Sequence, residues 1–199
     1  MTGFGFTEAI NYSFIAKDSC DKLRMDADDP RRKIVNIVNP LSEDQAVMRT
    51  SLIPGLLETM RFNLFQQVRT VRVFEIGKTF IAKEHDNLPE QTEFLAALWA
   101  GSRADLSWHS QETACDFYDL KGILEALFKG LNIKDICFAA LPNEKCRYTR
   151  PGFTAEILAN GKSVGILGEL HPEVLKAYHL KQTAYIFEIN AEILPELVA

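Results

Sequence analysis

Two histidines near the C-terminus are the first residues with a candidate chemistry. His171 and His179 lie eight positions apart, so on one helix they would share a face and could bind a metal ion such as zinc. A zinc site needs further ligands, but the cysteines at positions 20, 115, 137 and 146 contain no C-x-x-C pair. We therefore predict no metal site. His171 begins a helix in a His-Pro turn, His179 is a surface residue, and the cysteines are free, buried or half-buried thiols, as in a cytoplasmic protein.

Carboxylates and hydroxyls give no stronger signal for catalysis. Asp116 and Asp119 could form an acid–base pair, but their position at the start of a predicted helix suits stabilisation of its positive end. Ser42, Ser51 and Ser107 lack the G-x-S-x-G context of a nucleophile. The sequence also has no glycine-rich phosphate loop and no H-E-x-x-H motif. We therefore predict no catalytic residue and no cofactor site.

A basic loop is the candidate for nucleic-acid or anion binding. Lys145, Arg147 and Arg150 could contact an RNA phosphate, or they could form ordinary solvated surface. The whole chain does not favour phosphate binding, because 22 basic and 27 acidic residues give it a net charge of −5. These three residues are therefore a candidate anion contact, with solvated surface as the alternative.

The composition is that of a globular protein with one well-filled core. Hydrophobic residues make up 47% of the 199 residues and charged residues 25%. No apolar run approaches the ~20 residues of a bilayer span, and the N-terminus lacks the basic region of a signal peptide. The chain opens on a glycine-aromatic turn and a strand, so we expect a piece of a longer protein with Met1 added.

Hydrophobic periodicity predicts more strands than helices. Alternating apolar residues predict strands at 8–16, 33–38, 71–82, 91–101, 136–141 and 184–190, and a hairpin at 153–170 that turns at Asn160-Gly161. Amphipathic helices are predicted at 51–68 and 116–131, and shorter ones at 18–24 and 171–180. Ser51 can cap the first long helix, and Pro54 suits its first turn. The pattern predicts an α+β domain with one antiparallel sheet and helices on one face.

The helix at 51–68 has two aromatic side chains outside its apolar stripe. Relative to Leu52, the stripe runs from zero to roughly 160°, whereas Phe65 lies near 220° and Phe62 near 280°, at about 100° per residue. Phe65 could wrap over the rim of the core. Phe62 should be exposed unless a partner covers it. We therefore predict that Phe62, Phe65, Gln66 and Arg69 mark a partner-contact surface.

Four sequence blocks occur in a fixed order along the chain. They are NPLSEDQAVMRTSLIPGLLETMRFNL, VRVFEIGKTF, DFYDLKGILEAL and GILGELHPEVL. Together they resemble the core domain of the bacterial phenylalanyl-tRNA synthetase β subunit, over essentially the whole chain. The resemblance implies that residues 1–199 form a single class II synthetase-like domain, an antiparallel sheet flanked by helices, from a much longer subunit.

The resemblance also implies a division of roles between two subunits. The α subunit of this family, which has the same fold, uses ATP and Mg²⁺ to activate phenylalanine and transfers it to tRNA for protein biosynthesis. The β core is a degenerate copy that pairs with the α subunit in an α₂β₂ heterotetramer. This ligase domain would then have no active site or cofactor of its own, would meet tRNA through the holoenzyme, and would contact no membrane.

Two departures from a catalytic class II pattern agree with that implication. A catalytic strand resembling GKTF continues with an arginine that holds the ATP phosphate and the amino-acid carboxylate. Here Phe80 is followed by Ile81, and Lys83 is a poor replacement. The segment HLKQTAYIFEINAEILPEL lacks the glycines and the arginine of a catalytic ATP-binding junction. The turn RPGF at 150–153 also departs from the family's His-Pro-Gly-Arg-like turn, so no role is carried over to it.

The alternative is a stand-alone class II-like enzyme or a small-molecule-binding relative with an altered pocket. Arginines, histidines and carboxylates that converge on the inward face of the sheet would favour this alternative. Phenylalanine, isoleucine and leucine that fill the face would favour a non-catalytic interaction module. The inward candidates are mixed: Glu75, Trp99 and Glu169 beside Phe74, Leu98 and Leu167.

Overall fold

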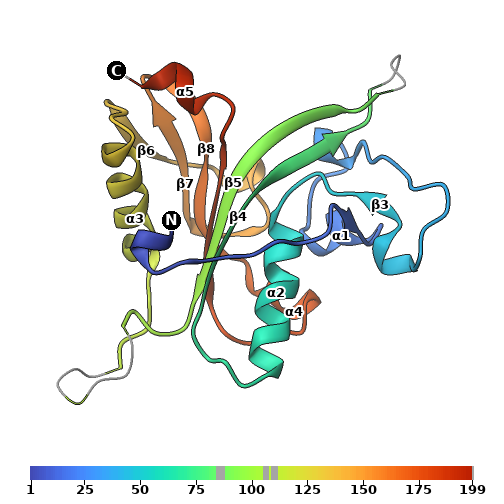
Figure 1. Ribbon diagram of the computed structural model, residues 1–199, viewed down its shortest axis with the longest axis horizontal. Coiled ribbons are helices and arrows are strands. Elements are labelled where there is room, and N and C mark those ends of the chain that lie inside the picture. The colour runs from blue at the N-terminus through green and yellow to red at the C-terminus, as the bar shows by residue number, and fades with distance from the viewer. Residues whose placement is uncertain (84–87, 105–107, 109–111, 199) are drawn as a thin grey trace.

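A mixed β-sheet organises the chain. The computed structural model describes residues 1–83, 88–104, 108 and 112–198. Within this part, one sheet has the strand order β1 (Thr7–Glu8), β4 (Val71–Ile81), β5 (Glu90–Ala100), β9 (Ala184–Asn190), β8 (Lys162–Leu170), β7 (Thr149–Ala159) and β6 (Ile136–Ala140) (Figure 1). β1 runs parallel to β4, and the other neighbours are antiparallel. The α+β class is confirmed, but the sheet is mixed and not wholly antiparallel.

Helices cover both faces of this sheet. α2 (Ile53–Phe65) and α4 (Pro172–Ala177) pack on one face, and α3 (Phe117–Gly130) packs on the other (Figure 1). The prediction of helices on one face is therefore wrong. Alternate residues of the run Leu95–Ala100 in β5 enter the two different cores. A strand buried on both faces appears in sequence as a continuous apolar run, and FLAALWA is such a run.

The remaining elements are short. They are the helices α1 (Ser19–Lys22) and α5 (Leu194–Leu197), the 3₁₀ turns η1 (Thr2–Phe4), η2 (Pro30–Arg32), η3 (Glu43–Gln45) and η4 (Asn143–Lys145), and the strands β2 (Phe14–Ile15) and β3 (Val47–Met48). β2 and β3 pair with each other in antiparallel fashion. Among the described residues, none of the helices combines the length and the apolar content that a membrane crossing requires.

Two local predictions from turn and cap chemistry are confirmed. Asn160 and Gly161 have φ angles of 49° and 73°, and positive φ at both central residues is what a type I′ hairpin turn requires. At the start of α3, the Asp119 backbone N–H donates to Asp116 Oδ1 at 2.9 Å, and the Asp116 backbone N–H donates to Asp119 Oδ2 at 2.8 Å. These two carboxylates form a reciprocal capping box, so their role is structural.

Two predicted strands and one helix end are wrong. The strand expected at 8–16 is interrupted between β1 and β2, and residues 33–38 contribute only the bridge Asn36–Val47. In both segments, partners distant in sequence determine the backbone path. α2 ends at Phe65 and does not reach residue 68, because Gln67 adopts a left-handed φ of 67°. Ser51 does accept the Ile53 N–H at 3.2 Å, one position before the N-cap Leu52.

Candidate functional site

The sheet face beneath α2 contains a buried ion pair. Arg49 directly follows β3, and its carbonyl accepts the Phe80 N–H at 2.8 Å, which places it beside β4. Its Nη1 donates to Glu75 Oε1 at 2.5 Å, and its Nε donates to the Lys78 carbonyl at 2.9 Å. Both charged side chains are almost fully buried. A Cβ atom at Gly77 would collide with Arg49 Nη2, so this glycine makes room for the guanidinium.

The second carboxylate oxygen of Glu75 anchors the N-terminal segment. Asn11 Nδ2 donates to Glu75 Oε2 at 2.7 Å, and Asn11 Oδ1 accepts from Thr59 Oγ1 in α2 at 2.8 Å. A Cβ atom added at Gly55 would lie 3.1 Å from the Asn11 Cβ atom. The absence of a side chain at position 55 therefore lets the segment lie against α2. One buried glutamate thus joins β4, Arg49 and the segment between β1 and β2.

A second buried carboxylate, Glu188 of β9, holds the start of α2. Its Oε1 accepts from Ser51 Oγ at 2.9 Å and from the Leu52 N–H at 2.8 Å. The first N–H groups of a helix lack partners within the helix, and a negative charge beside them is favourable. Burial raises the pKa of Glu188, and this effect outweighs the opposing effects of the Leu52 amide, the Arg31 guanidinium and the Ser51 hydroxyl.

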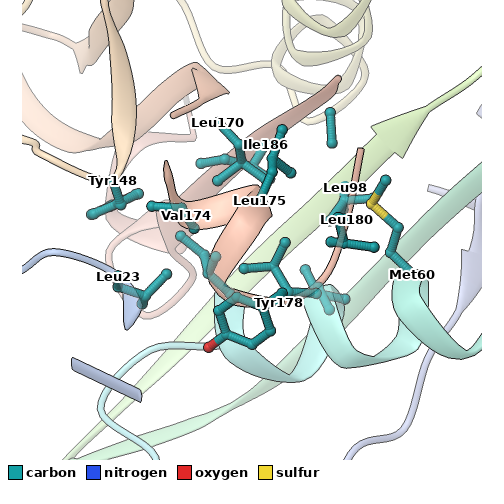
Figure 2. Packing of buried hydrophobic residues seen from close by; sticks show 14 of the residues in the cluster. Leu23, Met60, Leu98, Tyr148, Leu170, Val174, Leu175, Tyr178, Leu180 and Ile186 are labelled. Carbon is teal, nitrogen blue, oxygen red and sulfur yellow. The ribbon is translucent and has the colours of Figure 1, made fainter. Parts of the chain in front are cut away.

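Arginines and carboxylates therefore do converge on this face, but they bind one another. Arg31 pairs with Asp29 at 2.7 Å and donates to the Tyr148 hydroxyl at 3.3 Å. Apolar side chains fill the rest of the face, and Figure 2 shows several of them, from α2 (Met60), α4 (Val174 and Leu175) and the strands β5, β8 and β9 (Leu98, Leu170 and Ile186). Within the described residues, these charged groups are thus committed to partners in the same chain.

The inward candidates named from sequence do not form one set. Only Glu75 and Leu98 lie beneath α2, whereas Phe74, Trp99, Leu167 and Glu169 lie on the α3 side. That prediction is wrong because the sheet has two buried faces. Ile81, at the position after Phe80, is half-buried at the end of β4, and Lys83 is exposed beyond the strand. Among the described residues, no three histidine, cysteine or acidic side chains gather as a metal site.

The outer side of α2 and the segment beside it expose large apolar side chains. Phe62 is 65% exposed and Phe65 is 84% exposed, so Phe62 is exposed as predicted and Phe65 does not wrap over the core. Gln66 and Arg69 are exposed as well. Ile10 and Tyr12, on either side of the anchored Asn11, are 92% and 73% exposed. We call Ile10, Tyr12, Phe62 and Phe65 the α2 outer surface; that a partner covers it stays a prediction.

The basic loop is partly neutralised by carboxylates of the same chain. Lys145 is exposed at the end of η4. Arg147 Nε lies 2.9 Å from Asp26 Oδ2, and Arg150 Nη1 lies 2.9 Å from Glu169 Oε1. These ion pairs reduce the charge that the loop can offer to an RNA phosphate. Its role as an anion contact stays a prediction.

The histidines and cysteines do not come together as ligands. His171 caps α4, where its Nδ1 accepts the Glu173 N–H at 3.1 Å, and His179 is exposed with a φ of 58°. The four cysteines are free. Three are buried, but Cys137 is exposed, which corrects the prediction for that residue. It lies on β6, the strand at one edge of the sheet.

Sequence reasoning missed the Arg49–Glu75 pair and the role of Glu188. Their partners are 26 and 136 or more residues away along the chain. A signal was nevertheless present, because each glutamate lies between apolar residues of its strand, in VFEIG and in IFEIN. A charge in a strand that is apolar on both sides indicates a buried, paired carboxylate.

Comparison with known families identifies the chain. Residues 1–191 match the model of the family described as "Phenylalanyl tRNA synthetase beta chain CLM domain". The chain belongs to this family. Phenylalanine–tRNA ligase β subunits similar to it include those of Syntrophus aciditrophicus, 42% identical over 99% of the chain, Moorella thermoacetica, 39% identical over 97%, and Carboxydothermus hydrogenoformans, 38% identical over 100%. The match covers 24% of each of these relatives, so this CLM domain spans about a quarter of their length.

Proposed function

We propose that the chain is a non-catalytic, class II synthetase-like core domain of a phenylalanine–tRNA ligase β subunit. It supports the ATP-dependent attachment of phenylalanine to tRNA by pairing with a catalytic α subunit in a cytoplasmic α₂β₂ heterotetramer. In this proposal the α subunit binds ATP and Mg²⁺, and tRNA meets the domain only as part of the holoenzyme.

The buried polar network supports a role without catalysis. A catalytic arginine must direct its guanidinium at the reacting phosphate and carboxylate. Position 81 holds isoleucine, and Arg49, which lies beside β4 on this face, is bound to Glu75 and to the Lys78 carbonyl. The groups that could have bound a nucleotide on this face instead hold Asn11 and the start of α2 in place.

The α2 outer surface is the observation that carries the pairing proposal. Phe62, exposed to 65%, lies on a helix whose opposite face is fully buried. Large apolar groups grouped on one side of a protein mark interaction sites. The segment with Ile10 and Tyr12 lies against the same helix, through the contacts of Asn11 with Gly55 and Thr59. A partner at this surface would thus meet two chain segments that Glu75 and Asn11 hold together.

The test compares Phe62→Ala with Tyr118→Ala in the full-length β subunit. Tyr118 is 74% exposed on α3, on the other side of the sheet, so it is a matched control. A phenyl group desolvated at the centre of an interface contributes about 2 kcal/mol, or roughly thirtyfold in affinity. We expect Phe62→Ala to weaken binding of the α subunit by this factor with little change in melting temperature, and Tyr118→Ala to leave binding unchanged. Equal affinities for the two variants would refute this assignment of the contact.

A further inference from the structure

A hollow of about 460 Å³ lies beside the α2 outer surface. Five segments contribute its walls: Tyr12 and Phe14 from the N-terminal segment, Lys22 from α1, Asp44 from η3, Glu58 and Arg61 from α2, and Tyr178 after α4. A hollow of this size, with aromatic walls and a few polar groups, has the character of a binding site. Arg61 directly precedes Phe62, so the hollow adjoins the surface proposed to bind the α subunit.

The hydroxyl of Tyr178 lacks a hydrogen-bond partner. The residue is only 3% exposed, yet its Oη has no partner within the described part of the chain. Figure 2 shows this oxygen at the end of the ring that points away from Leu180 and Met60. Burial raises the pKa of the phenol; the Ser19 side chain opposes this but is not in hydrogen-bonding geometry. This oxygen is enclosed by protein atoms, although the residue lines the hollow. Buried hydroxyls are normally paired, so an unpaired one beside a hollow indicates a ligand group that reaches it after a small movement of the surrounding side chains.

The unmatched charge in the hollow is negative. The hollow is lined by one lysine and one arginine, and each already pairs with a carboxylate. Lys22 lies 3.1 Å from Asp18, and Arg61 lies 2.7 Å from Glu58. Asp44 has no ion pair among the described residues. A neighbouring hollow shares Asp44 and is also lined by Asp18, Glu43 and Lys17, so the surroundings of Asp44 are acidic. His179, which also lines the hollow, is exposed.

We propose that this hollow binds an arginine side chain from the α subunit that docks on the α2 outer surface. The proposal rests on the function proposed above and names the anchor of that contact. A guanidinium has five donors in one plane, so it can bond to the Asp44 carboxylate and direct a further N–H at the Tyr178 oxygen, which a small movement of the side chains around it would uncover. Its planar face and its stem suit the aromatic walls formed by Tyr12 and Phe14. Arginine is also enriched among the residues that dominate binding at interfaces.

Two conservative substitutions test the proposal in the full-length β subunit with its α subunit. Tyr178→Phe removes only the unpaired hydroxyl, so it should leave the melting temperature of the free β subunit unchanged or raised. The same variant should weaken binding of the α subunit about three- to tenfold. Asp44→Asn, which removes the unmatched charge, should weaken it about tenfold.

Matched controls separate the hollow from general effects on the fold. Tyr148→Phe removes a hydroxyl that accepts a bond from Arg31 outside the hollow, so it should lower the melting temperature without changing the affinity. Asp28→Asn alters an exposed aspartate that does not line the hollow, and should change neither quantity. If Tyr178→Phe and Asp44→Asn bind the α subunit as wild type does while Phe62→Ala does not, the anchor is refuted and the pairing proposal stands.

A titration with a small probe tests the chemistry of the hollow independently of the α subunit. Nα-acetyl-arginine amide should bind the chain saturably at millimolar concentration, detected by NMR shifts at Asp44 and Tyr178, and Asp44→Asn should abolish this binding. The citrulline analogue, similar in shape but uncharged, should not bind. If the wild-type β subunit binds no α subunit, the pairing proposal fails. Binding of the arginine probe alone would then still support a site in the hollow that binds a cation. Equal binding of the citrulline analogue, or no binding of either probe, would overturn the inference.

Discussion

The Arg49–Glu75 ion pair allows a quantitative test of how burial changes the contribution of an ion pair to the free energy of unfolding. The side chains of Arg49 and Glu75 are only 6% and 4% exposed. In Glu75→Leu, the Arg49 guanidinium would keep its charge in the core without a counter-charge, a change that costs about 3–5 kcal/mol. The lost hydrogen bond to Asn11 accounts for about 1 kcal/mol of this. We therefore expect Glu75→Leu to lower the free energy of unfolding by about 3–5 kcal/mol in total, with an unchanged m-value. Urea unfolding at neutral pH, followed by circular dichroism, measures both quantities.

The chain contains a surface ion pair that serves as the matched control. Arg61 and Glu58 lie 2.7 Å apart, but their side chains are 52% and 47% exposed. Glu58→Ala should therefore cost less than about 1 kcal/mol. The double variant Arg49→Met, Glu75→Leu replaces the buried pair by apolar groups and should recover most of the loss of Glu75→Leu. The reasoning fails if Glu75→Leu lowers the free energy of unfolding no more than Glu58→Ala does. It also fails if the double variant loses as much stability as the single variants Arg49→Met and Glu75→Leu lose together.

Three further expectations follow from features described above. Because burial raises the folded-state pKa of Glu188, its carboxyl stabilises the fold most at low pH and loses this contribution as pH rises from about 4.5 through the raised pKa. When urea unfolding is compared from pH 4.5 to 7.5, Glu188→Gln should therefore lose less free energy of unfolding than wild type. Parallel plots of this free energy against pH would contradict the assignment. Valine at both Asn160 and Gly161 should lower the free energy of unfolding by about 1 kcal/mol or more per residue, since φ is positive at both. Asn160→Asp is the control that should be tolerated. A thermal melt of the valine variant identical to that of wild type would argue against this. Calorimetric titration of the chain with ATP-Mg²⁺ and phenylalanine should show no heat above dilution, and a saturable micromolar signal would revive the stand-alone enzyme.

Local chemistry explains which elements could be predicted from the sequence. The helices α2 and α3 and the β7–β8 hairpin each have a periodic pattern and a local start or turn signal, such as the Asp116 cap or the Asn160-Gly161 turn. β5 is marked instead by its continuous apolar run. The segment after β1 has equally clear alternation, but Asn11 turns inward to Glu75 and Thr59, so its apolar neighbours face solvent. An alternating pattern predicts that the two sides of an extended segment differ in polarity. Contacts with residues distant in sequence decide which of the two sides is buried.

The candidate site was predictable only in part for the same reason. The exposure of Phe62 follows from its angle on one helix, which is a local property. The Arg49–Glu75 pair, the Glu188 contact with α2 and the hollow around Tyr178 each join segments that are far apart in sequence. Periodicity within a window of residues contains no information on such pairings.

The position of β9 determines when the sheet can be completed during synthesis on the ribosome. β9 lies between β5 and β8, yet it is the last of these strands to be translated. Until residues 184–190 emerge, β1, β4 and β5 form one half of the sheet and β8, β7 and β6 the other, each with an open edge facing the gap. Unpaired edges of this kind are templates for aggregation in a nascent chain. A truncation that stops before residue 184 therefore removes the centre of the sheet, although it removes only residues near the end of the chain.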